Sequence, residues 1–205
     1  MRVLGVQAVV GVARCVGCGR REGVLCGSCS DEMRSADPRE APRPLDRLLC
    51  ALDYSGAARS LVLDLKLRGR SGAAPPLVDR MADELARSGS RARVVTWVPG
   101  RRRETRRRGF DHAAVLAHGV ARRTGLPARP LLDRVGGVFD QTSLSAADRW
   151  LNLEAAFTAG RCREPVLVVD DLVTTGATLR SCARALAEAG SLGVEALVAC
   201  SAQAR

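Results

Sequence analysis

The sequence predicts an α/β protein with a doubly wound, mainly parallel sheet and a small cysteine-rich knuckle in front of it. Three observations lead to this expectation. Short apolar runs alternate with helical stretches from residue 47 onward, four cysteines form two close pairs near the N-terminus, and a proline-rich segment separates the two regions. Strands that alternate with helices are typical of parallel sheets covered on both faces. The 205 residues suffice for one such domain with an appendage.

Composition divides the chain into three parts. Residues 1–34 hold an apolar lead, expected to be a short helix, and the four-cysteine knuckle. Residues 35–46 carry three prolines and are expected to be a linker. Residues 47–205 are expected to form the main domain.

The first half of the main domain shows two strand patterns and two helix patterns. Residues 48–54 form an apolar run typical of a strand, and residues 57–67 carry apolar side chains at helical spacing. Prolines open a second expected helix at 75–87, because proline suits the first helical turn. A buried strand is expected at 93–98.

The second half repeats this alternation. A helix is expected at 111–123, ending near Gly125 and Pro127, because both residue types terminate helices. Residues 136–150 show little periodicity and are expected to form a loop. The expected domain is completed by a strongly apolar strand at 165–169, a helix at 177–189 and a last strand at 194–200.

Charge alone does not decide the function. The formal net charge is +10, and every basic residue except Lys66 is an arginine. This favours polyanionic partners, such as phosphorylated metabolites or nucleic acid, although a GC-rich genome produces the same bias. Aromatic residues make up 3% of the chain, which argues against a platform that stacks many bases.

The expected location is the cytoplasm. No apolar run approaches the ~20 residues of a membrane helix, so no membrane partner is expected. Residues 3–13 have the length of a signal-peptide core, but no small-residue cleavage site follows them, and export is the alternative interpretation. The close pairing of the cysteines favours a metal in a reducing compartment.

The paired cysteines predict a structural zinc site. Two Cys-x-x-Cys turns supply the four thiolates that zinc prefers in closed tetrahedral sites, which leave no open position for a catalytic water. Redox pairs, buried free cysteines and an iron–sulfur site are the alternatives. The predicted ligands are Cys15, Cys18, Cys26 and Cys29, whereas Cys50, Cys162, Cys182 and Cys200 are expected to be small core or surface residues.

The most specific pattern is a strand that runs into two acids, a hydroxyl-rich turn and a helix. Asp170 and Asp171 follow the apolar residues 166–169, and three threonines and Gly176 come next. Backbone N–H groups of such a turn and of the new helix form an anion cradle. The acids are suited to sugar hydroxyls or to a Mg²⁺ ion beside a phosphate. A simple helix cap is the alternative, but it explains one of these residues and not all of them.

This string resembles the 5-phosphoribosyl-1-pyrophosphate (PRPP) loop of type I phosphoribosyltransferases, and the whole chain resembles the ComF family of competence-protein-F-like proteins. The family joins a four-cysteine knuckle to such a domain. The tract around Lys66 is similar to the family's lysine-containing helix end, residues 98–99 and 107–110 resemble its pyrophosphate-side loop and Arg-Gly-Phe motif, and residues 141–157 resemble its mobile-loop signature. Residues 47–205 are therefore expected to be a phosphoribosyltransferase-like domain.

The resemblance implies a role for individual residues. Catalytic roles fall to Asp170, Asp171 and Arg149. PRPP contacts fall to Thr174, Thr175, Gly176, Ala177, Thr178, Pro99, Gly100, Arg101 and Lys66. The implied cofactors are a structural zinc ion and a Mg²⁺ ion that accompanies PRPP.

Two departures from the family pattern lie near the pyrophosphate side. Asp111-His112-Ala113 stands where the family usually has Asn-Gln-Ala, and Trp97 stands where proline is common. His112 is a candidate general acid or base because its ordinary pKa suits physiological pH, the alternative being a histidine that packs at a helix start. His118 lies nearly opposite on the same expected helix, so the two do not form a metal pair.

Residues 101–108 include six arginines. Arginine matches phosphate oxygens with paired donors, so the run suits pyrophosphate or a nucleic-acid backbone. A solvated surface segment is the third interpretation.

The resemblance implies pentosyl transfer, in which a nitrogen nucleophile attacks the anomeric carbon of PRPP and pyrophosphate departs. The ligand is PRPP or a phosphoribosyl nucleotide, and the sequence does not identify the acceptor. Two other interpretations stay open. One is an accessory protein of DNA uptake that binds single-stranded DNA or a competence helicase, and the other is a PRPP-responsive regulator.

Overall fold

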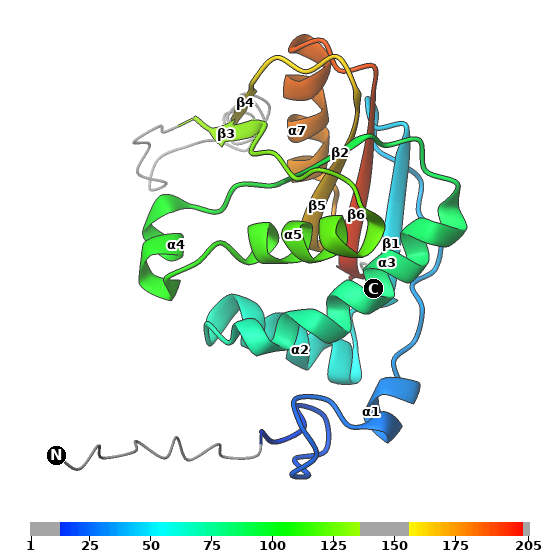
Figure 1. Ribbon diagram of the computed structural model, residues 1–205, viewed down its shortest axis with the longest axis vertical. Coiled ribbons are helices and arrows are strands. Elements are labelled where there is room, and N and C mark those ends of the chain that lie inside the picture. Colours follow the sequence, from blue (N-terminus) through cyan, green and yellow to red (C-terminus); the bar gives the residue numbers. More distant parts are fainter. Residues whose placement is uncertain (1–12, 136–155, 203–205) are drawn as a thin grey trace, which may run out of the picture.

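The computed structural model describes residues 13–135 and 156–202, which build a four-stranded parallel sheet with helices on both faces (Figure 1). In these described ranges, no helix is long and apolar enough to cross a membrane. The elements in chain order are α1 (Gly27–Asp31), β1 (Arg47–Asp53), α2 (Gly56–Leu67), η1 (Ser71–Ala73), α3 (Ala74–Ser88), β2 (Val94–Trp97), α4 (Arg102–Arg108), α5 (His112–Thr124), β3 (Leu132–Arg134), β4 (Phe157–Ala159), β5 (Pro165–Val173), α7 (Ala177–Glu188) and β6 (Gly193–Ser201).

The strand order of the main sheet is β1-β6-β5-β2, and all neighbouring strands are parallel. The central strands β5 and β6 are the longest, and their residues are almost all buried. Strands buried on both faces have near-continuous apolar sequences, as these two do. A separate antiparallel pair joins β3 and β4.

Alternate residues of the strands face two separate halves of the core. Leu167 and Val169 of β5 pack with α2, α3 and α5, whereas Val166 and Val168 pack with α7. Successive side chains of a strand point to opposite faces, so a single strand contributes to both halves. Figure 1 shows α3 and α5 on one side of the sheet and α7 on the other. The predicted doubly wound α/β fold is confirmed.

The principal strands and helices lie close to their predicted positions, with one functionally important difference. β5 continues to Val173 instead of ending at residue 169, because Asp170 and Leu172 pair with β6. The acid pair is therefore part of the sheet. Helix α4 and the β3–β4 pair were not predicted, while the expected helix at 3–13, up to residue 12, and the expected loop at 136–150 fall outside the described residues.

The N-terminal region wraps around the edge strand β1. Val16, Val24 and Leu25 of the knuckle pack against the half of the core that contains α2 and α3. Ser35 forms a bridge with Leu52 of β1, and the chain then continues onto the other side of the sheet. There Ala36 and Ala41 pack against the α7 half of the core, in which Leu45 is buried. The proposed boundaries at residues 34 and 46 stay a prediction.

Candidate functional site

Asp170 and Asp171 lie near the carboxyl end of β5 and point to opposite faces of the sheet. Asp171 is 1% exposed and lies beside α2 and α5. Asp170 is partly exposed and lies on the α7 face, where burial and the nearby Asp170 charge raise the pKa of the Cys182 thiol. Strand alternation thus gives the two adjacent carboxylates different neighbours, although one oxygen of each and a ring nitrogen of His112 lie within 4.8 Å of one another.

Asp171 is held by two basic side chains. Lys66 Nζ lies 3.1 Å from Oδ2 and donates to Oδ1 at 3.2 Å. His112 Nε2 lies 3.6 Å from Oδ1. Burial alone would raise the pKa of Asp171, but the His112 contact and the Lys66 charge outweigh it and lower the pKa to about 2. Asp171 is therefore a buried carboxylate whose negative charge is compensated by side chains of α2 and α5.

Asp170 has the opposite electrostatic character. Its Oδ1 accepts a hydrogen bond from the backbone N–H of Asp171 at 2.9 Å. Burial and the neighbouring Asp171 charge raise the pKa of Asp170 well above its ordinary value. A carboxylate in this position is stabilised by a cation or by hydroxyl donors from a ligand.

The turn after β5 leads directly into the N-terminus of α7. Thr174 and Thr175 are exposed, and Gly176 adopts φ +78° at the N-cap of α7. No side chain caps this helix in the manner of an N-cap, although Ala177 N donates weakly to Thr175 Oγ1 at 3.4 Å. A helix N-terminus without a side-chain cap attracts anions through its N–H groups and its dipole.

Asp111, which departs from the family pattern, joins α5 to the predicted pyrophosphate-side loop. Its Oδ1 accepts from Ala113 N at 3.0 Å and so caps α5, while its Oδ2 accepts from Gly100 N at 2.8 Å. A Cβ atom at Gly100 would lie 2.9 Å from Thr105 Oγ1, so the loop requires glycine there. An acid at position 111 therefore has a local structural role.

A second anchor of this loop comes from β3. Arg134 Nε donates to Pro99 O at 3.3 Å, and its guanidinium lies 4.6 Å from the ring centre of Phe157. Burial and the nearby Arg101 charge lower the pKa of Arg134. Arg134 and Arg101 thus bring two basic side chains to the loop at which the sequence predicts pyrophosphate binding.

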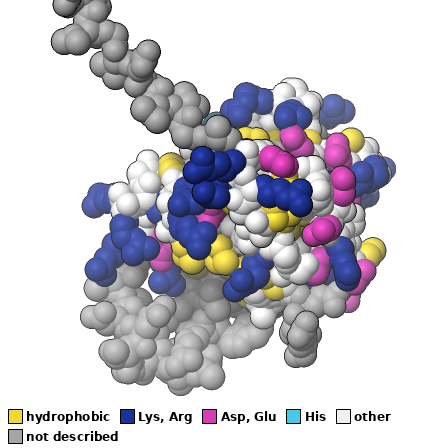
Figure 2. Space-filling view, turned by 90° about the horizontal axis from the view of Figure 1, so that it is seen from below, with side chains coloured by type: hydrophobic (Ala, Val, Ile, Leu, Met, Phe, Trp, Pro, Cys, Tyr) yellow, Lys and Arg dark blue, Asp and Glu magenta, His cyan; other side chains and the backbone are white. Residues whose placement is uncertain are grey.

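The arginine run forms α4, and its members differ sharply in exposure. Arg101, at the N-cap, is exposed. The Arg108 side chain is 4% exposed and donates to Lys66 O at 2.9 Å, so it ties α4 to the end of α2. The remaining arginines, which are exposed, are Arg102, Arg103, Arg106 and Arg107. Figure 2 shows basic side chains spread over the face seen from below, with fewer acidic ones among them.

The four predicted zinc ligands lie together. One ligand atom from each of Cys15, Cys18, Cys26 and Cys29 lies within 4.8 Å of the others. The Sγ atoms of Cys18 and Cys26 are 3.6 Å apart, and tetrahedral zinc with ~2.3 Å bonds places its sulfurs about 3.8 Å apart. Gly17 permits this approach, because a Cβ there would lie 2.7 Å from Cys29 Sγ. The cluster is capable of holding a zinc ion.

The pKa values of the thiols in the cluster depend on the neighbouring cysteines. Burial opposes ionisation of Cys15, but backbone N–H groups that include Cys18 and Cys26 lower its pKa to about 6. The neighbouring Cys26 thiol raises the pKa of Cys29 to about 12, and burial adds to this effect. The four other cysteines, Cys50, Cys162, Cys182 and Cys200, are buried, as expected for small core residues.

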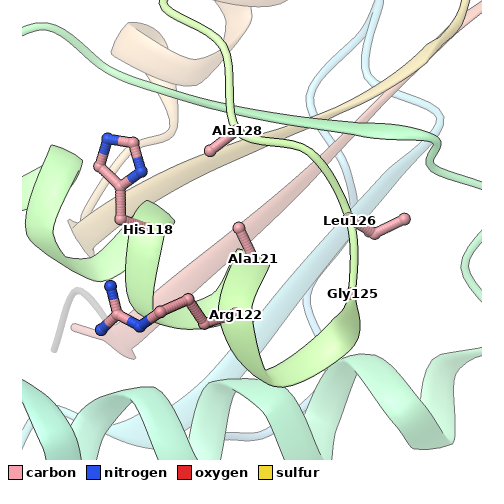
Figure 3. A pocket seen from close by; sticks show the side chains of 6 residues that line it. All are labelled: His118, Ala121, Arg122, Gly125, Leu126 and Ala128. Carbon is pink, nitrogen blue, oxygen red and sulfur yellow. The ribbon is translucent and has the colours of Figure 1, made fainter.

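A surface depression of about 480 Å³ lies away from the acid pair, at the end of α5 (Figure 3). Its lining includes His118, Arg122 and Leu126. Beside it, the rings of Trp97 and His118 lie 5.2 Å apart at 48°. His118 therefore belongs to a surface pocket, whereas His112 is buried beside Asp171.

The structure brings several predicted site residues together and reveals others. Lys66 meets Asp171, although 105 positions separate them in the chain. Arg149 and residues 141–145 fall outside the described residues. Arg134 was missed, because β3 is only three residues long and shows no clear periodicity.

The parallel sheet, the acid pair of its central strand and the open turn before α7 define a phosphoribosyltransferase-like α/β protein. The chain is 31% identical over 204 residues to DNA utilization protein YhgH from Salmonella typhi, covering 92% of this chain and 84% of that protein. It is 35% identical over 95 residues to Competence protein F from Haemophilus influenzae, covering 43% of this chain and 40% of that protein. The chain belongs to the ComF family.

The comparisons with family models and with solved structures give no further support for the family. No family model matches the chain. Among solved structures, the chain is similar to glutamine PRPP amidotransferase from B. subtilis, with 28% identity, 60% of this chain covered and a TM-score of 0.42. The chain spans 25% of that enzyme, and a likeness this partial carries no argument about activity.

Proposed function

We propose that the protein binds PRPP together with Mg²⁺ and transfers its phosphoribosyl group. The observation that carries this proposal is the turn at residues 174–178, which begins three residues after a carboxylate pair whose pKa values are shifted in opposite directions. The 5-phosphate of PRPP suits the turn, and the ribose hydroxyls suit the acids beside it.

The Lys66–Asp171 pair removes the main objection to a phosphate at this position. Two free carboxylates would repel a polyanion, but Asp171 already has the Lys66 ammonium at 3.1 Å and His112 at 3.6 Å. The remaining carboxylate, Asp170, is the natural acceptor for ribose hydroxyls and an oxygen donor for Mg²⁺. Its raised pKa indicates a group that gains from a bound cation or hydroxyl donor.

The reaction would break the bond between the anomeric carbon of PRPP and its pyrophosphate oxygen. Pyrophosphate leaves with the bonding electron pair, a nitrogen nucleophile forms the new bond to carbon, and that nitrogen loses its proton. Mg²⁺, when bound with PRPP, supplies charge neutralisation for the leaving group. Arg101 is assigned to the pyrophosphate side, and Arg149 is assigned to the charge of the departing pyrophosphate. The backbone of Pro99 and Gly100 supports this loop instead, because Pro99 O accepts from Arg134 and Gly100 N donates to Asp111.

A turnover screen tests this proposal. Zinc-loaded protein is supplied with PRPP, Mg²⁺ and a panel of nitrogenous bases, and pyrophosphate release is measured. Release that depends on one acceptor, and that is lost in Asp170→Asn, is the expected result. If PRPP binds but no acceptor yields pyrophosphate, transfer is contradicted and a PRPP-responsive role takes its place.

The second candidate is an accessory role in DNA uptake. Its support is the row of exposed arginines on α4, together with relatives named for DNA utilization and competence. In this role α4 contacts a single-stranded DNA backbone or a competence helicase, and the PRPP site acts as a sensor. Salt-sensitive DNA binding without turnover is the result that would favour it.

A further inference from the structure

The segment between the knuckle and β1 contacts the turn before α7 at two points. Arg39 Nη2 donates to Thr174 O at 2.6 Å. Its other terminal nitrogen donates to Ala202 O at 3.3 Å and Ser201 Oγ at 3.2 Å, so one guanidinium joins the turn to the end of β6. Pro42 lies against the same turn, since a Cβ at Gly176 would be 3.0 Å from its Cγ.

The Arg39 contact determines the direction of a backbone amide. In a planar trans peptide, the carbonyl and the N–H of the next residue point in opposite directions. Because the Thr174 carbonyl is held toward Arg39, the Thr175 N–H is turned away from Arg39. A site whose donors are already oriented binds more tightly, because less conformational entropy is lost on binding.

The segment that carries Arg39 is anchored independently at both ends. Near its start, Ser35 bridges to Leu52, and Asp53 N donates to Arg34 O at 2.9 Å. At its other end, Asp46 Oδ2 accepts from Val194 N at 2.8 Å. A change confined to the Arg39 side chain therefore leaves these anchors in place.

We propose that Arg39 is a positioning residue for a phosphomonoester bound at residues 174–178. Its guanidinium holds the Thr174–Thr175 peptide so that the turn presents its N–H group to the ligand, and the knuckle-side segment thereby completes the phosphate site. This inference rests on the proposed function only in placing the 5-phosphate of PRPP at that turn.

Calorimetry with Arg39→Gln, Arg39→Lys and a matched control tests the proposal. The control is Arg43→Gln, an exposed arginine of the same segment. The probes are ribose 5-phosphate, PRPP with Mg²⁺, and pyrophosphate with Mg²⁺. We expect Arg39→Gln to weaken ribose 5-phosphate and PRPP about tenfold, the order expected when a charge-assisted hydrogen bond is lost. Pyrophosphate affinity should change by less than about twofold, as for a distant surface charge.

The lysine variant separates positioning from general stability. Arg39→Lys retains a donor and should recover part of the ribose 5-phosphate affinity, whereas thermal melting of all three variants should stay close to wild type. Unchanged ribose 5-phosphate affinity in Arg39→Gln, or an equal loss for pyrophosphate, overturns the inference while leaving the proposed function intact. If the wild-type protein binds neither PRPP nor ribose 5-phosphate, the proposed function and this inference fail together.

Discussion

Lys66 and Asp171 form an ion pair between the last turn of α2 and the central strand β5, with Nζ 3.1 Å from Oδ2. The carboxylate is 2% exposed, while the ammonium side chain is 36% exposed. The pair therefore places one buried negative charge and its compensation at the carboxyl end of the sheet, close to the turn proposed to bind phosphate. The compensated charge makes an acidic strand end compatible with the proposed phosphate site.

Lys66→Met is expected to lower the free energy of unfolding at neutral pH by about 2 kcal/mol, because it removes the ammonium that compensates a buried carboxylate. The loss is smaller than the ~3–5 kcal/mol of fully buried pairs, since the ammonium is partly solvated. Urea denaturation measures it. The control is Arg87→Met, which breaks the surface pair with Glu84 and should cost no more than ~1 kcal/mol.

The effect of Lys66→Met should depend on pH in a defined direction. The pKa of Asp171 is lowered from 3.8 to about 2 in the folded protein, so its stabilisation is present above pH 3.8 and is lost as the pH falls toward 2. The stability difference between wild type and variant should therefore shrink as the pH is lowered through this window. A constant difference across the window would contradict the assigned ion pair.

Gly17→Ala is expected to weaken zinc binding, because the added Cβ would lie 2.7 Å from Cys29 Sγ. Gly27→Ala is the matched control, since its Cβ meets nothing within 4 Å. Metal analysis after purification under reducing conditions should find one zinc per chain in wild type and in Gly27→Ala, and less in Gly17→Ala. A zinc content near zero in folded wild-type protein would rule out the structural zinc.

Gly176→Ala should weaken the binding of PRPP and of inorganic phosphate together, because the turn adopts φ +78° and the added Cβ would lie 3.0 Å from Pro42 Cγ, which would have to shift. Gly89→Ala is the control, with φ +64° at the end of α3 and nothing within 4 Å. Both variants should lose about 1 kcal/mol of stability through backbone strain. Equal ligand affinity in the two variants would show that the turn does not grip phosphate.

Neutralising the exposed arginines of α4 tests the DNA-related alternative. If these side chains contact single-stranded DNA, each lost contact should reduce the slope of log affinity against log salt by about 0.7. PRPP affinity should then change little, because the ribose and 5-phosphate are assigned to another loop. A loss of PRPP affinity with an unchanged DNA salt slope would assign the arginines to pyrophosphate. No change in the affinity for either ligand would indicate that α4 is a solvated helix that binds neither. The substitutions are Arg102→Gln, Arg103→Gln, Arg106→Gln and Arg107→Gln.

Much of the fold was predictable because the strands and helices carry strong periodic signals. The buried strand at 165–169 and the amphipathic helix that follows were located from apolar spacing alone. The continuation of β5 through Asp170 was missed, because acids normally end an apolar strand. Here pairing with β6 and the compensation by Lys66 allow the strand to continue.

The parts that could not be predicted depend on contacts distant in the chain. Helix α4 consists of five arginines, a glutamate and a threonine, so it lacks the apolar stripe that identifies a helix in a sequence. Arg39 meets Thr174 across 135 positions, and nothing in its proline-rich surroundings indicates that contact. The candidate site residues were proposed from motif and resemblance and stay a prediction, whereas the contacts that compensate their charge appeared only in three dimensions.

The central claim is tested most directly by calorimetric titration of zinc-loaded protein with PRPP, with and without Mg²⁺, in wild type and Asp170→Asn. Asp170 is the appropriate position because a change at Asp171 also disrupts the ion pair with Lys66. We predict Mg²⁺-dependent binding of one PRPP per chain in wild type, and a loss in Asp170→Asn that is much larger for PRPP than for inorganic phosphate. Absence of PRPP binding, or an equal loss for both ligands, would contradict the account.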